Sequence, residues 1–62
     1  MEKEIRYAGK ICVLAYTYDE ETEPKWYNKA QYMIDNNRKN NIASCCIHNG
    51  NLHGYYEEKV VE

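Results

Sequence analysis

The sequence lacks the features on which most enzyme and cofactor signatures depend. It contains no phenylalanine, one proline and only three glycines among 62 residues. Gly9, Gly50 and Gly54 form no phosphate-cradling loop, and turns or strand crowding explain them better. No catalytic or nucleotide-binding motif rises above chance, and a chain this short leaves little room for a pocket that excludes water. We therefore expect a non-enzymatic protein without a cofactor.

Cysteine is scarce and odd in number. Cys45 and Cys46 are neighbours that could pair only through a strained vicinal ring, and Cys12 would then remain single. This pattern does not fit the disulfide framework of a secreted domain. The first four residues are largely charged, and no apolar run has the length of a signal-peptide core or a membrane span. We expect a reducing compartment, a cytoplasmic location and no membrane association.

The chain is short, and its charges are nearly balanced. Sixty-two residues predict one domain, residues 1–62, which hides only about 60% of the surface that its unfolded chain exposes. The net charge of −2 argues against nonspecific nucleic-acid binding, because that requires an excess of cations. Carboxylates gather at residues 19–23 and cations at residues 25–39. This segregation also complements the dipole of a helix.

A helical period marks the middle of the chain. The apolar positions that recur with this period, closed by one asparagine, are Trp26, Tyr27, Ala30, Met33, Ile34 and Asn37. Thr22 is a plausible N-cap and Pro24 fits the first turn. We therefore predict a helix from about residue 23 to residue 38, ended by the asparagines at positions 36–41, because asparagine tolerates the left-handed conformation.

The segments around the helix predict a sheet, since residues 11–18, 42–48 and 52–61 are rich in β-branched and aromatic side chains. Residues 4–18 fit a hairpin that turns at Gly9-Lys10 or one long strand with a bulge at Gly9, and we favour the hairpin. One helix without a second helix must pack on a sheet. The predicted fold is α+β, with the order β-β-α-β-β and one amphipathic helix on one face of a small, largely antiparallel sheet.

The last third of the chain predicts a second hairpin with two competing turns. Asn49-Gly50 as a type I′ turn places Cys46 opposite His53, whereas Gly50-Asn51 as a type II′ turn places His48 opposite His53. Both registers give the same faces. One face carries Ala43, Cys45, Ile47, Leu52, Tyr56 and Val60, and the other carries Ser44, Cys46, His48, His53, Tyr55, Glu57 and Lys59. We predict that the first set packs on the helix.

A homodimer is predicted from the strand at residues 11–18. Regular alternation places Cys12, Leu14, Tyr16 and Tyr18 on one face of this strand. A single helix on the other side of the sheet would leave that face in water. A second copy of the chain is the most economical cover for it.

Two chemical sites deserve testing on the second face of the hairpin. Cys46, His48 and His53 offer sulfur and nitrogen ligands for zinc, but their spacing matches no standard zinc framework, so no metal is predicted. Cys46 and His53 would form a nucleophile pair in the first register only. No third orienting group accompanies them.

The leading functional hypothesis is a small binding protein that engages and inhibits another macromolecule. The predicted binding residues are three tyrosines on sheet faces taken to be exposed and three carboxylates: Tyr16, Tyr18, Asp19, Glu20, Glu21 and Tyr55. Aromatic side chains would anchor the partner, and the carboxylates would steer a basic or nucleic-acid-handling protein. Small acidic proteins of phages and other mobile elements that block a host defence factor provide the analogy.

Two alternatives stay open. A dimer cleft that contains Tyr16, His48, His53 and Tyr55 would bind a nucleotide or another small ligand by stacking and charge. The outer face of the helix would instead contact nucleic acid through its cations and one exposed ring. The residues of that second alternative are Lys25, Lys29, Tyr32, Arg38 and Lys39.

Overall fold

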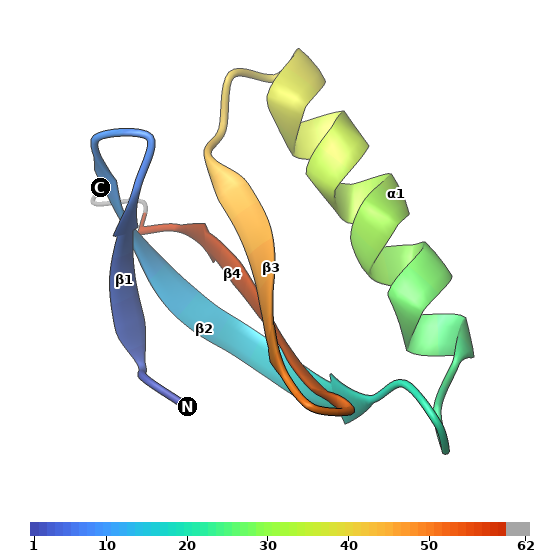
Figure 1. The fold of residues 1–62 in the computed structure, drawn as a ribbon. Helices are drawn as coiled ribbons and strands as arrows, with labels where there is room; N and C mark the ends of the chain where they lie inside the picture. The colour runs from blue at the N-terminus through green and yellow to red at the C-terminus, as the bar shows by residue number, and fades with distance from the viewer. Residues whose placement is uncertain (60–62) are drawn as a thin grey trace.

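The computed structural model describes residues 1–59, in which one helix follows the second of four strands (Figure 1). The elements are β1 (Glu4–Tyr7), β2 (Lys10–Asp19), α1 (Lys25–Lys39), β3 (Ser44–Asn49) and β4 (Leu52–Glu58). The predicted α+β class is confirmed. Val60 and Val61, which the sequence assigned to the last strand, lie outside the described residues.

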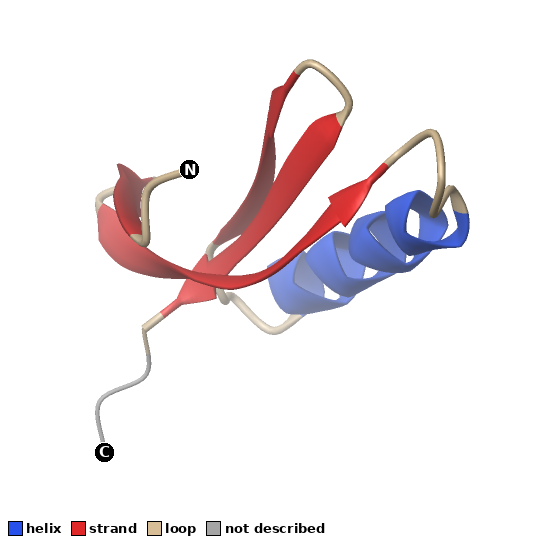
Figure 2. Ribbon diagram, turned by 90° about the horizontal axis from the view of Figure 1, so that it is seen from below, coloured by secondary structure: helices blue, strands red, loops and turns tan. Residues whose placement is uncertain are grey.

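The four strands form one sheet in the order β1-β2-β4-β3, and every neighbouring pair is antiparallel. The central strands β2 and β4 are paired along most of their length, and β1 and β3 are the edges. The helix lies along one face, and the sheet curls away from it toward the β1 end (Figure 2). Only one of the two faces of the sheet is therefore covered by the helix.

Both hairpins have two-residue turns. Tyr7 pairs with Lys10, so the first turn consists of Ala8 and Gly9, with φ values of 54° and 76°. Positive φ at both positions is typical of a type I′ turn, which suits the twist of the strands. The predicted hairpin is present, but its turn lies one residue earlier than the Gly9-Lys10 turn that we expected.

The second turn consists of Gly50 and Asn51, because Asn49 pairs with Leu52 and His48 pairs with His53. Gly50 has a φ of 62°, whereas Asn51 does not adopt a positive φ. This combination fits a type II′ turn. Of the two registers that the sequence allowed, the structure adopts the one that places His48 opposite His53.

A β-bulge divides β2 into two halves that face opposite ways. Leu14 pairs with Tyr56 and Tyr16 pairs with Tyr55, so Ala15 is an extra residue in β2. An inserted residue reverses the alternation of side chains beyond it. Leu14 therefore points to one face and Tyr16 to the other. The prediction that Cys12, Leu14, Tyr16 and Tyr18 share one face is wrong for this reason.

The helix packs on the face that we expected to be exposed. The buried centre of this layer consists of Tyr18, Ala30 and Tyr55, and the partly buried side chains around it are Tyr16, Trp26, Met33, Ile34 and Cys46. Trp26, Ala30, Met33 and Ile34 pack on the sheet as predicted, whereas Tyr27 is 45% exposed and the predicted sheet partners are wrong. The bulge explains the difference, because it adds two tyrosines of β2 to the face that carries Tyr55.

The opposite face has an apolar layer of its own. Cys12 and Tyr56 are fully or almost fully buried there. The N-terminal segment covers this layer, since Tyr56 Oη donates a hydrogen bond to the Glu2 carbonyl at 2.6 Å and the Leu14 N–H donates to the Lys3 carbonyl at 2.8 Å. The chain therefore covers with its own residues the surface from which a homodimer was predicted. The homodimer remains a prediction, but this surface no longer supports it.

The ends of α1 differ in how well they are capped. Pro24 occupies the N-cap position and provides no side-chain hydrogen bond, so the expected Thr22 cap is absent from the described residues. At the other end, Asn41 has a φ of 61°, its N–H donates to the Arg38 carbonyl, and the Ile42 N–H donates to the Asn37 carbonyl. These bonds define a Schellman motif. The predicted asparagine terminator is confirmed.

Candidate functional site

The three tyrosines predicted to anchor a partner belong to the core. Tyr55 has no exposed surface, Tyr18 retains 2% of its surface, and Tyr16 is partly buried with its hydroxyl 3.8 Å from the Met33 sulfur. The Tyr16 ring packs against Trp26 and Tyr55, with centroids at 5.2 and 5.1 Å. These distances are typical of stabilising aromatic pairs. The expected exposed aromatic surface is therefore wrong.

A buried chain of hydrogen bonds runs from the helix to the sheet. Asn37 Nδ2 donates to Tyr55 Oη at 2.7 Å, and Tyr55 Oη donates to Glu57 Oε2 at 3.0 Å. Burial, reinforced by the hydrogen bond to Glu57, raises the pKa of Tyr55 well above its ordinary value. Tyr55 is therefore a neutral structural link at physiological pH and not an acid or a nucleophile.

The thiols are not activated for chemistry. Burial raises the pKa of each cysteine, at Cys12, Cys45 and Cys46, above the ordinary value. A reactive thiolate requires the opposite shift. Cys46 lies opposite Tyr55 and not opposite His53, so the proposed nucleophile pair does not form. Among residues 1–59, no three histidine, cysteine or acidic side chains are close enough to hold a metal ion.

The histidines stack in the same layer. The His53 ring lies 5.0 Å from the Tyr18 ring and 5.2 Å from the His48 ring, both nearly parallel. His53 is buried, whereas His48 is exposed at the end of β3. Tyr16, His53 and Tyr55, which were expected to line a small-molecule site with His48, instead contact side chains of α1. Only His48 of this set is exposed.

The loop after β2 carries the predicted carboxylates and is held rigidly. Asp19 Oδ1 accepts hydrogen bonds from the N–H groups of Glu21 and Thr22. Glu20 Oε2 lies 3.0 Å from His53 Nε2, and Glu21 Oε2 accepts a hydrogen bond from Asn51 Nδ2 at 3.0 Å. We call residues 19–23 the acidic loop. Its contacts fix it to the β3–β4 turn, while its side chains at positions 20–23 stay exposed.

An apolar surface lies next to the acidic loop on the sheet face away from α1. Ile47 and Leu52 keep 41% and 43% of their surface exposed. The Met1 side chain covers Gly54, which pairs with Ile47, and Met1 is itself half exposed. We call Met1, Ile47 and Leu52 the apolar patch. The sequence predicted Ile47 and Leu52 to be buried under the helix, because the reversal at Ala15 was not foreseen.

The outer face of α1 carries the residues of the nucleic-acid alternative. Tyr32 is the most exposed aromatic side chain among the described residues, at 74%. Lys29 Nζ lies 4.7 Å from the centre of the Trp26 ring, a cation–π arrangement, and Lys25 borders the same shallow hollow. Part of this positive charge therefore has a structural role. A second hollow between Lys10 and Lys59 is lined by the ion pairs of these lysines with Glu58 and Glu4.

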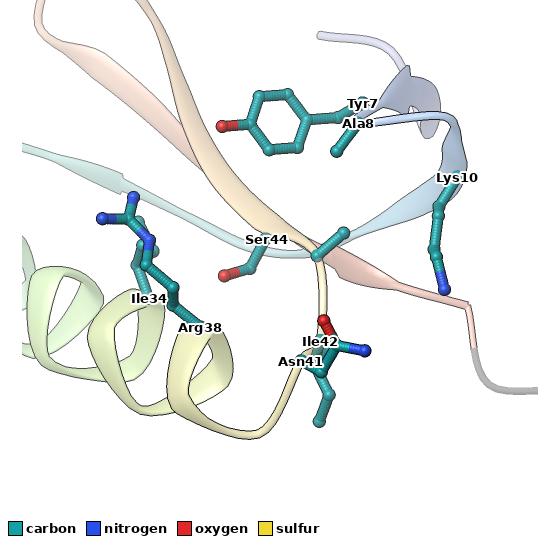
Figure 3. Close-up of a pocket in the computed structure, with 9 residues that line it drawn as sticks. Tyr7, Ala8, Lys10, Ile34, Arg38, Asn41, Ile42 and Ser44 are labelled. Atoms are coloured by element: carbon teal, nitrogen blue, oxygen red, sulfur yellow. The ribbon is translucent and has the colours of Figure 1, made fainter.

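A third cavity of about 280 Å³ lies near the C-terminal end of α1 (Figure 3). It is lined by Tyr7, Arg38 and Ser44, among other residues. From the sequence we expected no role for Tyr7, and we expected Ser44 only on a sheet face. No local pattern unites these residues, because three separate elements bring them together.

No family model, curated protein or solved structure matches this chain. Within the described residues, α1 lacks the length and the apolar character needed to cross a membrane.

Proposed function

We propose that this protein is a small non-enzymatic binding protein that engages another macromolecule and inhibits it by occupying its surface. The observation that carries the proposal is the apolar patch beside the acidic loop. Isolated exposed apolar residues are common, but neighbouring ones with a charged rim are typical of protein interfaces. The Cys12 thiol, the phenols of Tyr18 and Tyr55 and the His53 imidazole are buried, and the thiols of Cys45 and Cys46 are partly buried, which favours recognition over catalysis.

The surface is presented on a rigid support. Ile47 and Leu52 are on paired strands, and Leu52 is also paired with Asp19 at the start of the acidic loop. The contacts of Glu20 and Glu21 with the β3–β4 hairpin hold the loop against these strands. A preorganised surface loses little conformational entropy on binding. This supports a role as a docking surface.

The chemistry of the surface defines the class of partner. A partner that fits it presents an apolar side chain beside lysine or arginine, because the acidic loop carries exposed carboxylates at positions 21 and 23. The Glu20 carboxylate contacts His53 on the α1 side of the sheet. Opposite charges at the rim raise the association rate, and the apolar centre contributes most of the affinity. A basic, nucleic-acid-handling protein of a host cell meets this description.

The test is affinity capture with matched variants, followed by identification of the retained proteins. The double variant Ile47→Ser and Leu52→Ser is expected to lose at least one basic protein that the unaltered chain retains. The variant Tyr32→Ser removes a still more exposed aromatic side chain from the outer face of α1 and is expected to retain that protein. Adding the pure chain to the captured protein is then expected to reduce that protein's activity in proportion to occupancy.

The charge component has its own control. Replacing Glu21 and Glu23 with lysine should weaken capture and slow association, whereas Asp35→Lys on the exposed side of α1 should not. The proposal is wrong if every retained protein tolerates the double variant in the apolar patch. It is also wrong if retention depends on Lys25 and Lys29 and falls steeply with salt, since that result indicates nucleic-acid binding.

A further inference from the structure

The cavity at the C-terminal end of α1 has walls from three parts of the chain that are distant in sequence. Tyr7 and Ala8 come from the β1–β2 turn region, Ile34 and Arg38 from the last turns of α1, and residues 41–44 from the segment that leads into β3. Its volume of about 280 Å³ is close to the roughly 300 Å³ at which pockets for small organic ligands begin.

Two polar side chains face this cavity without a partner in residues 1–59. The Arg38 guanidinium has no carboxylate within ion-pair distance. Ser44 is only 7% exposed as a residue, and its hydroxyl makes no hydrogen bond to another described side chain or backbone group. Its oxygen is not sealed from solvent, because Tyr18 Oη is the one fully buried side-chain polar atom without a partner among residues 1–59. The hydroxyl is therefore free to bond a ligand in the cavity. Figure 3 shows both side chains directed toward the same space.

The remaining walls suit a flat organic group. The Tyr7 ring lies across the cavity from Arg38 and is 44% exposed, so one of its faces is free to stack. Ile34 and Ile42 add apolar surface. Lys10 also lines the cavity, but its Nζ lies 3.6 Å from Glu58, which leaves Arg38 as the cation available to a ligand.

The C-terminal end of α1 does not repel an anion bound in this cavity. Free carbonyl groups at a helix C-terminus carry partial negative charge. In α1 the carbonyls of Asn36, Asn37 and Arg38 accept hydrogen bonds from the N–H groups of residues 40–42. Arg38 and Lys39 in the last turn further offset the dipole.

We propose that this cavity binds a small organic anion that joins a phosphate group to a flat ring, the class to which nucleoside monophosphates belong. The guanidinium of Arg38 holds the phosphate through paired N–H donors, and the Ser44 hydroxyl donates a third hydrogen bond. The ring stacks on Tyr7. This site is separate from the apolar patch and does not depend on the function proposed above.

Titration of the intact protein with AMP, GMP, CMP and UMP, followed by amide NMR and calorimetry, tests the proposal. We expect at least one of them to bind and to shift the amide signals of residues 7–8 and 41–44 more than those of residues 47–52. Adenosine supplies the ring without the anion, and inorganic phosphate supplies the anion without the ring. Both are expected to bind at least about tenfold more weakly than AMP, because each lacks one of the two contacts.

Matched variants separate recognition from general charge. Arg38→Gln should weaken nucleotide binding about tenfold or more, whereas Lys39→Gln removes the same charge from the adjacent residue outside the cavity and should leave the affinity unchanged. Tyr7→Leu should weaken the binding of AMP but not the binding of inorganic phosphate. Circular dichroism confirms that each variant is folded.

Three results would overturn the proposal. The first is the absence of binding by all four nucleotides at millimolar concentration. The second is adenosine or phosphate that binds as tightly as AMP. The third is an equal loss of affinity in Arg38→Gln and Lys39→Gln, which would indicate only diffuse attraction to positive charge.

Discussion

At the level of single residues, the tyrosines of this chain serve the interior. A protein without phenylalanine must bury tyrosine hydroxyl groups wherever it needs aromatic rings in its core. Each buried hydroxyl then requires a hydrogen-bond partner. Tyr55 has partners in Asn37 and Glu57, and Tyr56 has the Glu2 carbonyl. Tyr18 Oη is buried without a hydrogen-bond partner among the described residues. Burial, followed by the nearby Cys46 thiol and the phenols of Tyr16 and Tyr27, raises the pKa of Tyr18 well above its ordinary value.

This contrast predicts opposite effects for the same substitution. Tyr55→Phe leaves the Asn37 amide buried without its acceptor, so we expect the free energy of unfolding to fall by about 1–3 kcal/mol. Tyr18→Phe removes a hydroxyl that has no partner, so we expect the free energy of unfolding to stay unchanged or to rise by up to about 1 kcal/mol. Urea denaturation followed by Trp26 fluorescence measures both.

Tyr32→Phe is the control for this pair, because its exposed hydroxyl should contribute less than about 0.5 kcal/mol. Equal losses in Tyr18→Phe and Tyr55→Phe would show that the hydrogen bonds of Tyr55 contribute nothing specific. The side chain of Tyr55 would then stabilise the core through packing alone.

At the level of elements, the β1–β2 turn contains a residue in an unfavourable conformation. Ala8 has a φ of 54°, a left-handed conformation that costs a residue with a Cβ atom roughly 1–2 kcal/mol. We predict that Ala8→Gly keeps or raises the free energy of unfolding, by up to about 1 kcal/mol. The matched change Ala15→Gly, at the exposed bulge where φ is not positive, should lower it by roughly 0.5–1 kcal/mol.

Thermal denaturation of the two variants compares them directly. A loss of stability in Ala8→Gly as large as that in Ala15→Gly would contradict the left-handed conformation of the turn. Preserved chemical shifts in β3 and β4 would show that the effect is confined to the first hairpin.

The elements themselves were predictable from sequence, but the face on which each side chain lies was not. The period of 3.6 residues placed α1, the asparagines placed its end, and the turn residues limited the second hairpin to two registers. Both α1 and the hairpins follow from interactions between residues close in sequence. The extra residue at Ala15 has no local signature. A strand that is apolar on both faces shows the same sequence pattern whether or not it contains one inserted residue.

The consequences of that one residue reach the candidate site. It placed Tyr16 and Tyr18 under the helix, whereas Ile47 and Leu52 are exposed. The surface predicted from the sequence to bind a partner and the apolar patch proposed here therefore lie on opposite faces of the sheet. The cavity beside Arg38 was missed for a different reason. Tyr7, Arg38 and Ser44 are separated by 31 and 6 positions in the sequence, and only the tertiary fold unites them.

At the level of the whole molecule, one sheet separates two small apolar layers. The layer under α1 contains Tyr18 and Tyr55, and the layer under the N-terminal segment contains Cys12 and Tyr56. Both layers include side chains that ionise in alkaline solution. Burial is the main cause that raises the pKa of the three cysteines and of Tyr16, Tyr18 and Tyr55. The folded protein therefore holds these protons more tightly than the unfolded chain.

This difference predicts that the protein is destabilised by alkali. Below the ordinary pKa values of 9.0 for cysteine and 10.0 for tyrosine, both states are protonated and stability does not depend on these groups. As the pH rises beyond these values, the unfolded chain releases protons that the folded protein retains, and the free energy of unfolding falls. Urea midpoints measured in the presence of a reducing agent should decline steadily from about pH 9 upward.

Tyr18→Phe should show a shallower decline of the urea midpoint above about pH 10, because it lacks one of the phenols whose pKa is raised by burial. A midpoint that stays constant or rises over this range would mean that the thiols and phenols are accessible to water in the folded protein, and that the two layers are not closed.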